Sequence, residues 1–590
     1  MKGIFNAAYT KRCGQLGRLG GQVKRSQEKT FNLHMTKIKD QLHSRREFLG
    51  IFAASIPLLS FGKIEPQIIL YNGNIFTVNP KEPTVQALAI ADGRLIAIGS
   101  NKDILRLATA KTKKVDVGYK TILPGFIDAH THPAYSGIKH LKMVDCDLRS
   151  IKEIKDAIRK RAAITPKGNW VEGFKYDDTK TNEDRKINMA DLDDAAPEHP
   201  IRIIHRGGHT YYCNTLAFKM ASIDESTPNP KGGEFEKTPD NKLTGCVKEA
   251  AADVFDKIIP ELDTRSDRQE GVKLISKMLG KSGITSATEA YGTPDYLQAY
   301  EDAYEAGDLN TRIYSMISYK HIEKMIAAGV RTGMGNEWVK IGAMKITCDG
   351  SISERTARLS QPYTGRSNDY GIIVMDDEQM YPYAKKAYDA GWQIGVHGNG
   401  DVGIDITLKL FERLHKESPK KDPRFRIEHC TMINDSLIQR MKSLGVIPMP
   451  FSTYVYYHGE KMKAYGEERL KNMFALRSFL DAGIRPTIGS DYPPGPFEPM
   501  MFLQSSVTRT DMKGNVWGAN QKVTVEEAIK IGTINGAYAS FEENIKGSLE
   551  AGKLADLVVL GRNPFKEDPF TLTTIPIERT MTGGKWVYES

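Results

Sequence analysis

Cysteine is scarce and scattered in this chain. The 590 residues include six cysteines, with no Cys-x-x-Cys spacing and no dense cluster. This pattern argues against a metal cluster built on cysteine and against a small scaffold held together by disulfides. We therefore expect buried free thiols at the six positions, which are Cys13, Cys146, Cys213, Cys246, Cys348 and Cys430.

The body of the chain has little excess charge of either sign. The formal net charge is +9, but residues 1–47 hold eleven lysines and arginines against three acidic residues. That surplus of eight leaves about +1 for all the residues that follow. A near-neutral body lacks the basic footprint of a nucleic-acid-binding protein, so we expect no nucleic-acid partner.

Hydrophobic runs long enough for a membrane span are also lacking. The apolar stretch at residues 51–61 is too short to cross a bilayer as an ordinary helix, which needs about 20 residues. It follows Ser44-Arg45-Arg46-Glu47-Phe48-Leu49-Gly50, which resembles a twin-arginine export signal. We expect the twin-arginine translocation machinery to export the chain, either to the periplasm or to an anchored position on the outer side of the inner membrane.

Three features of this signal stay open. No clean Ala-x-Ala cleavage site is present near residues 61–63, so the signal could be removed or kept as an anchor. Translation could start at Met1 or at Met35, ten residues before the arginine pair. The alternative to a signal is an ordinary helix that follows a chance Arg-Arg pair.

Several widespread catalytic motifs are absent. The sequence has no Gly-x-Ser-x-Gly elbow, no Walker A motif and no credible dinucleotide fingerprint. These absences argue against a serine hydrolase of the elbow type, a P-loop nucleotidase and a Rossmann dehydrogenase.

Strand-like and helix-like segments alternate through most of the chain, which predicts an α/β fold with a (β/α)8 TIM-like barrel over residues 121–544. An apolar run at residues 121–127 predicts the first strand. The other strand candidates are residues 201–204, 283–288, 312–316, 341–346, 393–396, 426–427, 446–449 and 486–488. Residues from about 134 to 276 exceed what one barrel step needs, so we interpret them as an insertion over the pocket.

The two ends of the chain predict a small β-sandwich domain, over residues 64–120 and 545–590. Asn72-Gly73 and Asp92-Gly93 each lie between apolar runs, which is the sequence signal of a β-hairpin. A last strand is expected near residues 585–588. The predicted organisation is therefore an N-terminal extension with the signal over residues 1–63, then the split sandwich domain enclosing the barrel.

Potential metal ligands follow several predicted strands. Leu-Pro-Gly-Phe-Ile-Asp-Ala-His-Thr-His-Pro (residues 123–133) places His130 and His132 two residues apart, so that both can face the same side. His397, His429 and Asp491 end three later strands. Barrels build their sites at the carboxyl ends of strands, and imidazole and carboxylate bind divalent metals. The set predicts a centre for Zn²⁺ or another divalent metal.

These motifs resemble those of the amidohydrolase superfamily, and Leu-Pro-Gly-Phe-Ile-Asp-x-His-x-His resembles its first metal-binding strand. Blocks further along resemble the amidohydrolase 3 (YtcJ-like) branch. They are Lys345-Ile346-Thr347-Cys348-Asp349-Gly350-Ser351, His397-Gly398-Asn399-Gly400-Asp401, Arg426-Ile427-Glu428-His429-Cys430 and Gly489-Ser490-Asp491-Tyr492-Pro493. The resemblance runs from about residue 67 to the C-terminus and implies a TIM barrel with one or two metals. Glu289 stands where relatives often carry aspartate.

Lys345 is the most consequential residue of this resemblance. In dihydroorotase-like and hydantoinase-like relatives a lysine is carboxylated and bridges two metals, because burial beside cations lowers the pKa of its amine. The alternative is a lysine that caps a buried acid such as Asp349, in which case the site could hold one metal rather than two.

The resemblance implies a metal-dependent hydrolase that uses a metal-activated water to cleave a non-peptide carbon–nitrogen bond of a small-molecule substrate. Asp491 is expected to be the general base as well as a ligand. A deaminase or cyclic amidase on the same site, and a non-catalytic metal-dependent binding protein, are the alternatives. A homodimer is compatible with the sequence. The candidate substrate contacts, for each of which a structural role is equally open, are His209, Tyr176, Asp177, Arg355 and Arg509.

Replacement of both Arg45 and Arg46 by lysine should leave unprocessed chain in the cytoplasm, because the export pathway reads the guanidinium pair and not charge alone. Cell fractionation with immunodetection measures the distribution. The exchange of Lys37 and Lys39 for arginine is the matched control, which keeps the charge and should leave export unchanged. Normal export of the double lysine variant would show that this pair is not a twin-arginine signal.

Overall fold

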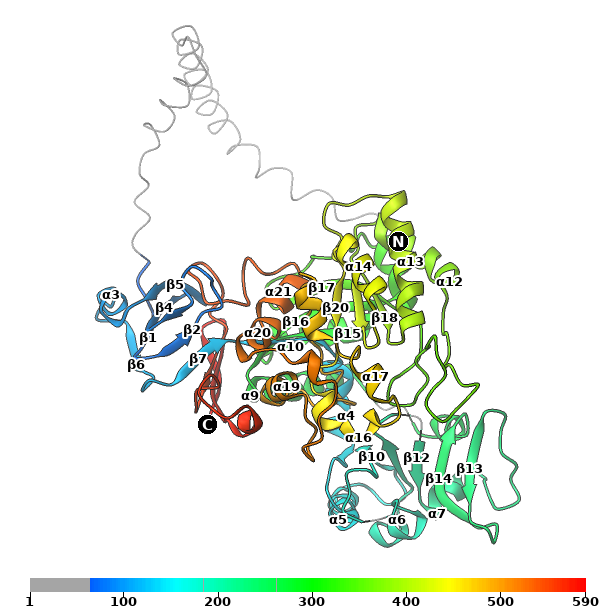
Figure 1. The fold of residues 1–590 in the computed structure, drawn as a ribbon. Coiled ribbons are helices and arrows are strands. Elements are labelled where there is room, and N and C mark those ends of the chain that lie inside the picture. The colour runs from blue at the N-terminus through cyan, green and yellow to red at the C-terminus, as the bar shows by residue number, and fades with distance from the viewer. Residues whose placement is uncertain (1–63, 184, 209, 261–262) are drawn as a thin grey trace, which may run out of the picture. The chain divides into compact units, whose positions relative to one another are not determined.

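The computed structural model describes residues 64–183, 185–208, 210–260 and 263–590. Glu65–Ser590 forms one compact unit, whose described residues are coloured in Figure 1. The predicted export signal and His209 lie outside the described residues. Within the described ranges, no helix has both the length and the apolar character that a membrane span requires.

Seven parallel strands form the central sheet, in the order β20-β19-β18-β17-β16-β15-β8. Their bounds are β8 (Phe126–Thr131), β15 (Ile284–Gly292), β16 (Arg312–Ser318), β17 (Val339–Thr347), β18 (Ile394–Gly398), β19 (Arg426–His429) and β20 (Ile447–Met449). Every residue of β8, β16, β19 and β20 is buried, as parallel strands covered on both faces require. The predicted α/β class is confirmed, with a nearly closed TIM-like barrel.

Helices alternate with these strands and pack on them with one apolar face. In α13 (Asp401–Glu417), the buried residues Ile404, Leu408 and Phe411 follow helical spacing and join a core with side chains of β17–β19. In α9 (Arg265–Lys281), a capping box at the N-terminus satisfies two backbone N–H groups that the helix itself cannot pair. Further helices of this layer are α10 (Pro294–Glu305), α12 (Asp377–Asp389) and α14 (Asp435–Leu444).

The predicted first strand is in fact two strands that separate at Gly125. β7 (Thr121–Pro124) pairs with β21 (Leu557–Leu560), whereas β8 joins the barrel beside β15. A Cβ atom at residue 125 would lie 2.1 Å from Thr285 Oγ1, so glycine is required where the chain passes between the sheets. The single-strand interpretation is wrong because an apolar run does not specify which sheet each part joins.

Residues 487–491 close the barrel without forming a regular strand. On the β8 side, Ala129 N donates to Ile488 O at 2.9 Å and Asp491 N donates to His130 O at 2.8 Å. On the β20 side, Thr487 N donates to the carbonyl of Pro448 at 3.1 Å. This segment therefore occupies the place of the eighth strand that residues 486–488 predict.

The chain between β8 and β15 forms a separate six-stranded sheet, in the order β13-β14-β12-β11-β10-β9. Residues 201–204, which the sequence assigns to the barrel, lie in β11 between β10 and β12, so that assignment is wrong. A short run of three isoleucines and one arginine fits either sheet equally well, and only the pairing decides between them. The bounds are β9 (Val144–Asp145), β10 (Val171–Tyr176), β11 (Ile201–His205), β12 (Thr210–Cys213), β13 (Gly233–Lys237) and β14 (Leu243–Glu249).

Both ends of the chain meet in another six-stranded sheet, in the order β23-β22-β21-β7-β2-β3. A four-stranded sheet, in the order β5-β4-β1-β6, lies nearby in sequence, and buried side chains of the two sheets share one apolar cluster. The sheet is built from both termini as expected, while the sandwich and the domain bounds stay predictions. The strands are β1 (Ile68–Tyr71), β2 (Asn74–Phe76), β3 (Thr84–Val85), β4 (Ala87–Ala91), β5 (Arg94–Gly99), β6 (Lys113–Asp116), β22 (Ile577–Thr582) and β23 (Lys585–Glu589).

The two predicted hairpins differ in outcome. Asp92 and Gly93 have φ of 48° and 73°, and they join the antiparallel strands β4 and β5 as predicted. The Asn72-Gly73 hairpin is wrong, because β1 pairs with β4 and β6 whereas β2 pairs with β3 and β7. The same turn signal here moves the chain from one sheet to the other.

The five cysteines within the described residues are buried and free, as expected from their spacing: Cys146, Cys213, Cys246, Cys348 and Cys430.

Gly489→Ala should destabilise the closure of the barrel. A Cβ atom at residue 489 would lie 2.2 Å from His130 Cβ and 2.7 Å from His130 O, so the backbone must shift. We expect the free energy of unfolding to fall by about 1–3 kcal/mol, the usual cost of overpacking, as measured by urea denaturation. The control is Gly280→Ala in α9, where the nearest atom is a Val587 methyl at 3.3 Å. Wild-type stability of Gly489→Ala would contradict the close contact between residues 489 and 130.

Candidate metal centre

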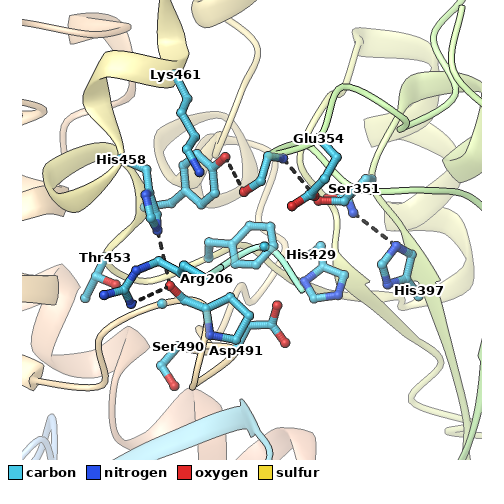
Figure 2. Close-up of a pocket in the computed structure, with 17 residues that line it drawn as sticks. Arg206, Ser351, Glu354, His397, His429, Thr453, His458, Lys461, Ser490 and Asp491 are labelled. Atoms are coloured by element: carbon cyan, nitrogen blue, oxygen red, sulfur yellow. Dashed lines mark hydrogen bonds between the residues drawn. The ribbon is translucent and has the colours of Figure 1, made fainter. Parts of the chain in front are cut away.

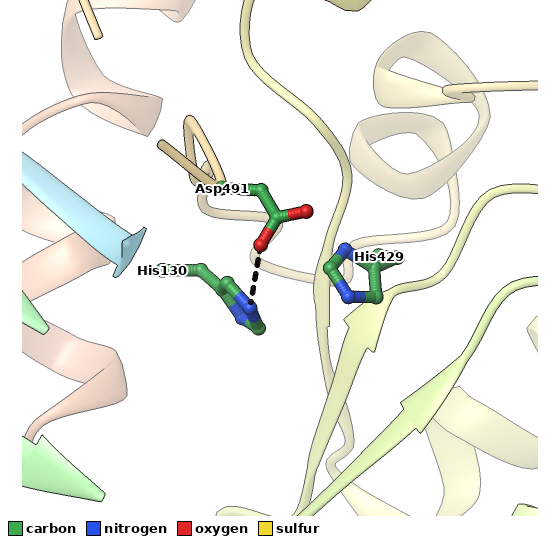
Figure 3. A group of neighbouring side chains, drawn as sticks. All are labelled: His130, His429 and Asp491. Atoms are coloured by element: carbon green, nitrogen blue, oxygen red, sulfur yellow. Dashed lines mark ion pairs between the residues drawn. The ribbon is translucent and has the colours of Figure 1, made fainter. Parts of the chain in front are cut away.

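Three side chains from distant parts of the chain meet at the carboxyl ends of the barrel strands (Figure 3). They are His130 in β8, His429 at the end of β19 and Asp491 in the closing segment. One potential ligand atom of each lies within 4.8 Å of the others, and His130 Nε2 is 3.5 Å from Asp491 Oδ1. Groups this close and this buried can surround one ion.

The second histidine of the first motif faces the same carboxylate. His132 follows β8, and its Nε2 lies 3.2 Å from Asp491 Oδ1. Both Nε2 atoms of the His-x-His pair therefore approach one oxygen of Asp491, as the spacing of two residues along a strand predicts.

His397 borders this cluster in a different orientation. Its ring centroid is 4.4 Å from that of His429, while its Nε2 is 3.0 Å from the carbonyl oxygen of Gly350. Nε2 also lies 3.1 Å from the amide nitrogen of Asn399, so these two contacts occupy Nε2 and leave Nδ1 open. If His397 binds a metal in this orientation, it does so through Nδ1.

Lys345 is buried in β17, and its amine forms no hydrogen bond with any residue that the structure describes. Burial lowers its pKa to about 8 against the opposing influence of Glu428. Asp349, the acid that Lys345 could have capped, instead accepts backbone hydrogen bonds from Asn399 and Gly400, both at 2.8 Å. The described contacts therefore do not support the capping alternative.

The charge states of the central residues suit a cation. Burial lowers the pKa of His429 far below its ordinary value, and burial together with Lys345 lowers that of His397 to about 4. Burial alone would raise the pKa of Asp491, but hydrogen bonds from His130 and His132 hold it well below its ordinary value. Neutral imidazoles and an ionised carboxylate are the donors that Zn²⁺ and similar ions bind.

His132 lies between two carboxylates and differs from the other histidines. Burial opposes its protonation, but hydrogen bonds to Asp491 and Glu289 outweigh burial and raise its pKa to about 9. A proton and a metal ion compete for the same lone pair of an imidazole, so metal binding at this residue would release a proton.

Two residues of the cluster have left-handed backbone conformations, which residues other than glycine rarely adopt. The φ angle is 71° at His429 and 55° at Asp491. Such conformations cost on the order of 1–3 kcal/mol each and are found most often at functional sites. The fold keeps both conformations, and the side chains of His429 and Asp491 then point toward His130.

A pocket of about 200 Å³ lies beside the cluster (Figure 2). His397, His429 and Asp491 form one side, and the aromatic rings of Phe451 and Tyr454 contribute an apolar wall. The remaining lining residues are Arg206, Gly207, Ser351, Ser353, Glu354, Asn399, Thr453, His458, Lys461, Ser490, Pro494 and Gly495.

Arg206 connects the separate sheet to the loop that carries Asp491. It follows β11, and its guanidinium pairs with Asp147 at 2.7 Å. The same guanidinium donates to the carbonyls of Pro493 and Pro494 at 3.3 and 3.2 Å. The sheet between β8 and β15 therefore contributes a pocket wall and holds the adjoining loop in place.

None of the four candidate substrate contacts that the structure describes lines this pocket. Tyr176 is fully buried, and its hydroxyl accepts a hydrogen bond from Ile187 N at 2.9 Å. Asp177 is buried, and its Oδ2 lies 3.8 Å from Nε of Arg206, which lines the pocket. Neither side chain reaches the pocket surface.

The two candidate arginines are placed differently. Arg509 is buried and donates to the backbone carbonyls of Trp517, Phe474 and Met473, which gives it a structural role. Arg355 is half-buried and adjoins Glu354, which does line the pocket.

The structure brings to the site several residues for which no sequence motif predicts a role. Glu428 contacts His130, and its only sequence signal is an acid next to a predicted ligand in a buried strand. His458 and Lys461 line the pocket from the chain after β20, where no motif marks them. Arg206 is equally unmarked, because its role depends on contacts with residues far along the chain.

Comparisons with known proteins find relatives that match most of this chain. The Amidohydro_3 model of the amidohydrolase family matches residues 114–588. The N-substituted formamide deformylase of Arthrobacter pascens is 29% identical over 537 residues, which cover 88% of this chain and 98% of the relative. The protein YtcJ of Bacillus subtilis (strain 168) is 27% identical over 534 residues, or 88% and 99% of the two chains.

A solved structure shows the same fold. The crystal structure described as an uncharacterized metal-dependent hydrolase from Pyrococcus horikoshii OT3 has a TM-score of 0.70 and 24% identity to this chain. It covers 85% of this chain and is itself covered over 99% of its length.

Proposed function

This chain belongs to the amidohydrolase family, and we propose that it is a metal-dependent hydrolase that cleaves a non-peptide carbon–nitrogen bond of amide type. The observation that carries the proposal is the meeting of His130, His429 and Asp491 at the end of the barrel where a pocket gives access. The name of the formamide deformylase relative supports a bond of this class.

The cofactor in this proposal is Zn²⁺ or another divalent ion, one or two per chain. His130, His429 and Asp491 would hold it, with His132 and His397 beside them. When bound, the ion would lower the pKa of a water molecule and polarise the substrate carbonyl. A second ion would require a further bridging ligand, for which carboxylated Lys345 is the candidate.

Asp491 is the proposed proton carrier. Its Oδ1 faces His130 and His132, whereas no hydrogen bond to Oδ2 is formed by any described residue. Because its pKa is held low, the carboxylate starts the reaction ionised and can accept a proton from the attacking water at Oδ2. Return of that proton to the leaving nitrogen releases the amine, while the carbonyl carbon keeps the hydroxyl of the water.

The pocket restricts the substrate by size and by its apolar wall. Its volume of about 200 Å³ is below the usual range for drug-sized ligands, which favours a compact acyl group such as formyl or a short acyl chain. Phe451 stacks on His429 with ring centroids 4.5 Å apart, so an apolar surface lies next to the reacting end.

We also propose that the chain acts outside the cytoplasm after export by the twin-arginine machinery. The support is the Arg45-Arg46 motif and the apolar stretch behind it, which lie outside the described residues. We further propose that the chain forms a homodimer, and size-exclusion chromatography with light scattering would measure its mass.

The test of the function is turnover of small amides by zinc-loaded protein. Purified protein should contain between one and two equivalents of divalent metal by elemental analysis, and it should hydrolyse N-substituted formamides or N-acyl amino acids. Exhaustive chelation should abolish turnover, and added Zn²⁺ should restore it. Turnover of cyclic imides alone would identify a cyclic amidase, and turnover of aminopurines alone a deaminase. Full activity without metal would overturn the proposal.

Asp491→Asn separates proton transfer from metal binding. The amide cannot accept the proton of the water, so kcat should fall by about 10²–10⁴-fold. The histidines still supply ligands, and most of the metal should remain in this variant. His130→Ala should instead lose metal and activity together, while Asp435→Asn, on the exposed start of α14, should match wild type. Near wild-type turnover of Asp491→Asn would remove Asp491 from the mechanism, and complete loss of metal would make it primarily a ligand.

A further inference from the structure

Each histidine of the His-x-His pair has a buried glutamate behind it. His130 Nδ1 forms a hydrogen bond with Glu428 Oε2, and His132 Nδ1 lies 3.4 Å from Glu289 Oε1. Both glutamates have no exposed surface. The two imidazoles therefore lie between a glutamate on the Nδ1 side and Asp491 on the Nε2 side.

Glu428 is fixed in place by an arginine on the same strand. Arg426 Nε donates to Glu428 Oε1 at 2.7 Å, and Arg426 Nη2 donates to Oε2 at 3.2 Å. Nη2 also donates to the carbonyl of Ala129, the residue before His130, at 2.7 Å. The Arg426 guanidinium thus holds two groups at once, the carboxylate of Glu428 and the backbone of β8 next to His130.

Glu289 is fixed by neutral donors. The hydroxyl of Tyr300 donates to Oε2 at 2.7 Å, and Ala134 N, in the first turn of α4 (Pro133–Lys142), lies 3.3 Å from the same oxygen. Tyr291 N donates to Oε1 at 3.2 Å. Glu289, at the position where relatives often carry aspartate, is therefore held in place by a hydrogen-bond network.

An ionised carboxylate can only accept hydrogen bonds, so the nitrogen opposite it must carry the hydrogen. A neutral imidazole has one N–H, and its other nitrogen then has the lone pair. With Nδ1–H directed at a glutamate, Nε2 is the nitrogen free to bind a metal. Carboxylates in this position are known to orient metal-binding histidines in general.

We propose that Glu428 and Glu289 are positioning residues, which keep a hydrogen on Nδ1 of His130 and His132, so that Nε2 is the nitrogen left to bind a metal beside Asp491. This inference rests on the proposed function, because a metal is what gives the Nε2 lone pairs their use. His397 provides the contrast, since the nitrogen held by protein contacts is Nε2, which lies beside the carbonyl of Gly350 and the amide nitrogen of Asn399.

Glu428→Gln tests the proposal with almost no change in shape. Arg426 makes its shorter bond to Oε1, so the amide oxygen should take that place and the NH₂ group the place of Oε2, where the 3.2 Å bond from Nη2 is lost while Nη2 keeps its bond to Ala129 O. The NH₂ group then donates to His130 Nδ1, which reverses the tautomer and puts the hydrogen on Nε2. Glu289→Gln makes the same change behind His132, with a smaller expected effect because that contact is longer.

Glu542→Gln is the matched control. Glu542 is also a buried glutamate, paired with Lys340 and Lys546 at 2.6 Å each, and it contacts none of the cluster. Its replacement should cost stability through the loss of buried ion pairs and leave metal binding unchanged. Any fall in metal affinity specific to the other two variants is then not a general effect of removing a buried carboxylate.

Two readouts decide the question. The first is the dissociation constant of Zn²⁺, measured by competition with a chromogenic chelator, which should rise about 10–100-fold in Glu428→Gln. The second is the ¹⁵N chemical shift of the His130 ring nitrogens in metal-free protein, labelled at histidine and assigned by its absence in His130→Gln. Wild type should show hydrogen on Nδ1, and Glu428→Gln should show none on this nitrogen.

The outcomes separate this inference from the proposed function. Wild type that binds Zn²⁺, together with Glu428→Gln and Glu289→Gln that bind it equally well, would overturn the positioning role and leave the proposed function intact. Wild type that binds no Zn²⁺ would remove the proposed function, and the ring shifts would still decide the tautomer. A wild-type His130 ring without hydrogen on Nδ1 would overturn the inference whatever the affinities.

Discussion

The constraint on which the site depends is the hydrogen bonding of residues 487–491 between β8 and β20. Asp128 strengthens the β8 side, because its carboxylate accepts hydrogen bonds from Ser490 N at 3.0 Å and Ser490 Oγ at 2.6 Å. This pairing brings Asp491 beside His130, which is 361 positions earlier in the chain. Without it the sheet would stay open at one edge, and the carboxylate would not meet the histidines.

Around this closure, buried polar side chains form one continuous network in which donors and acceptors alternate. Arg426 donates to Glu428, which contacts His130, and His130 and His132 both face Asp491. His132 in turn faces Glu289, whose other oxygen accepts from Tyr300. A charge buried without a partner costs several kcal/mol. In this network each charged group has a neighbour that offsets the cost of its burial. The low pKa of Asp491 is one consequence, since the two imidazoles stabilise its ionised form.

The separate sheet between β8 and β15 gives the barrel a wall that its own strands do not provide. Arg206 is largely desolvated, and its pairing with Asp147 offsets the cost of that burial. Because the same guanidinium also binds the carbonyls that follow Asp491, the shape of the pocket and the position of the loop that carries Asp491 are coupled. Residues that recognise a substrate are therefore expected on this sheet and on the chain after β20, away from the motifs.

The sequence by itself determined the local features. Three features follow from the two-residue period of a strand and from backbone preferences, both of which depend only on neighbours in the chain. They are the spacing of His130 and His132, the strand ends at His397 and His429, and the Asp92-Gly93 turn. Tertiary structure alone decided which strands pair, and hence the place of residues 201–204 and the failure of the Asn72-Gly73 hairpin. It also decided that Glu428 and Glu289 meet the two histidines while Arg509 holds backbone carbonyls. Such partners are set by the way the whole chain folds, and no pattern within one segment of the sequence predicts them.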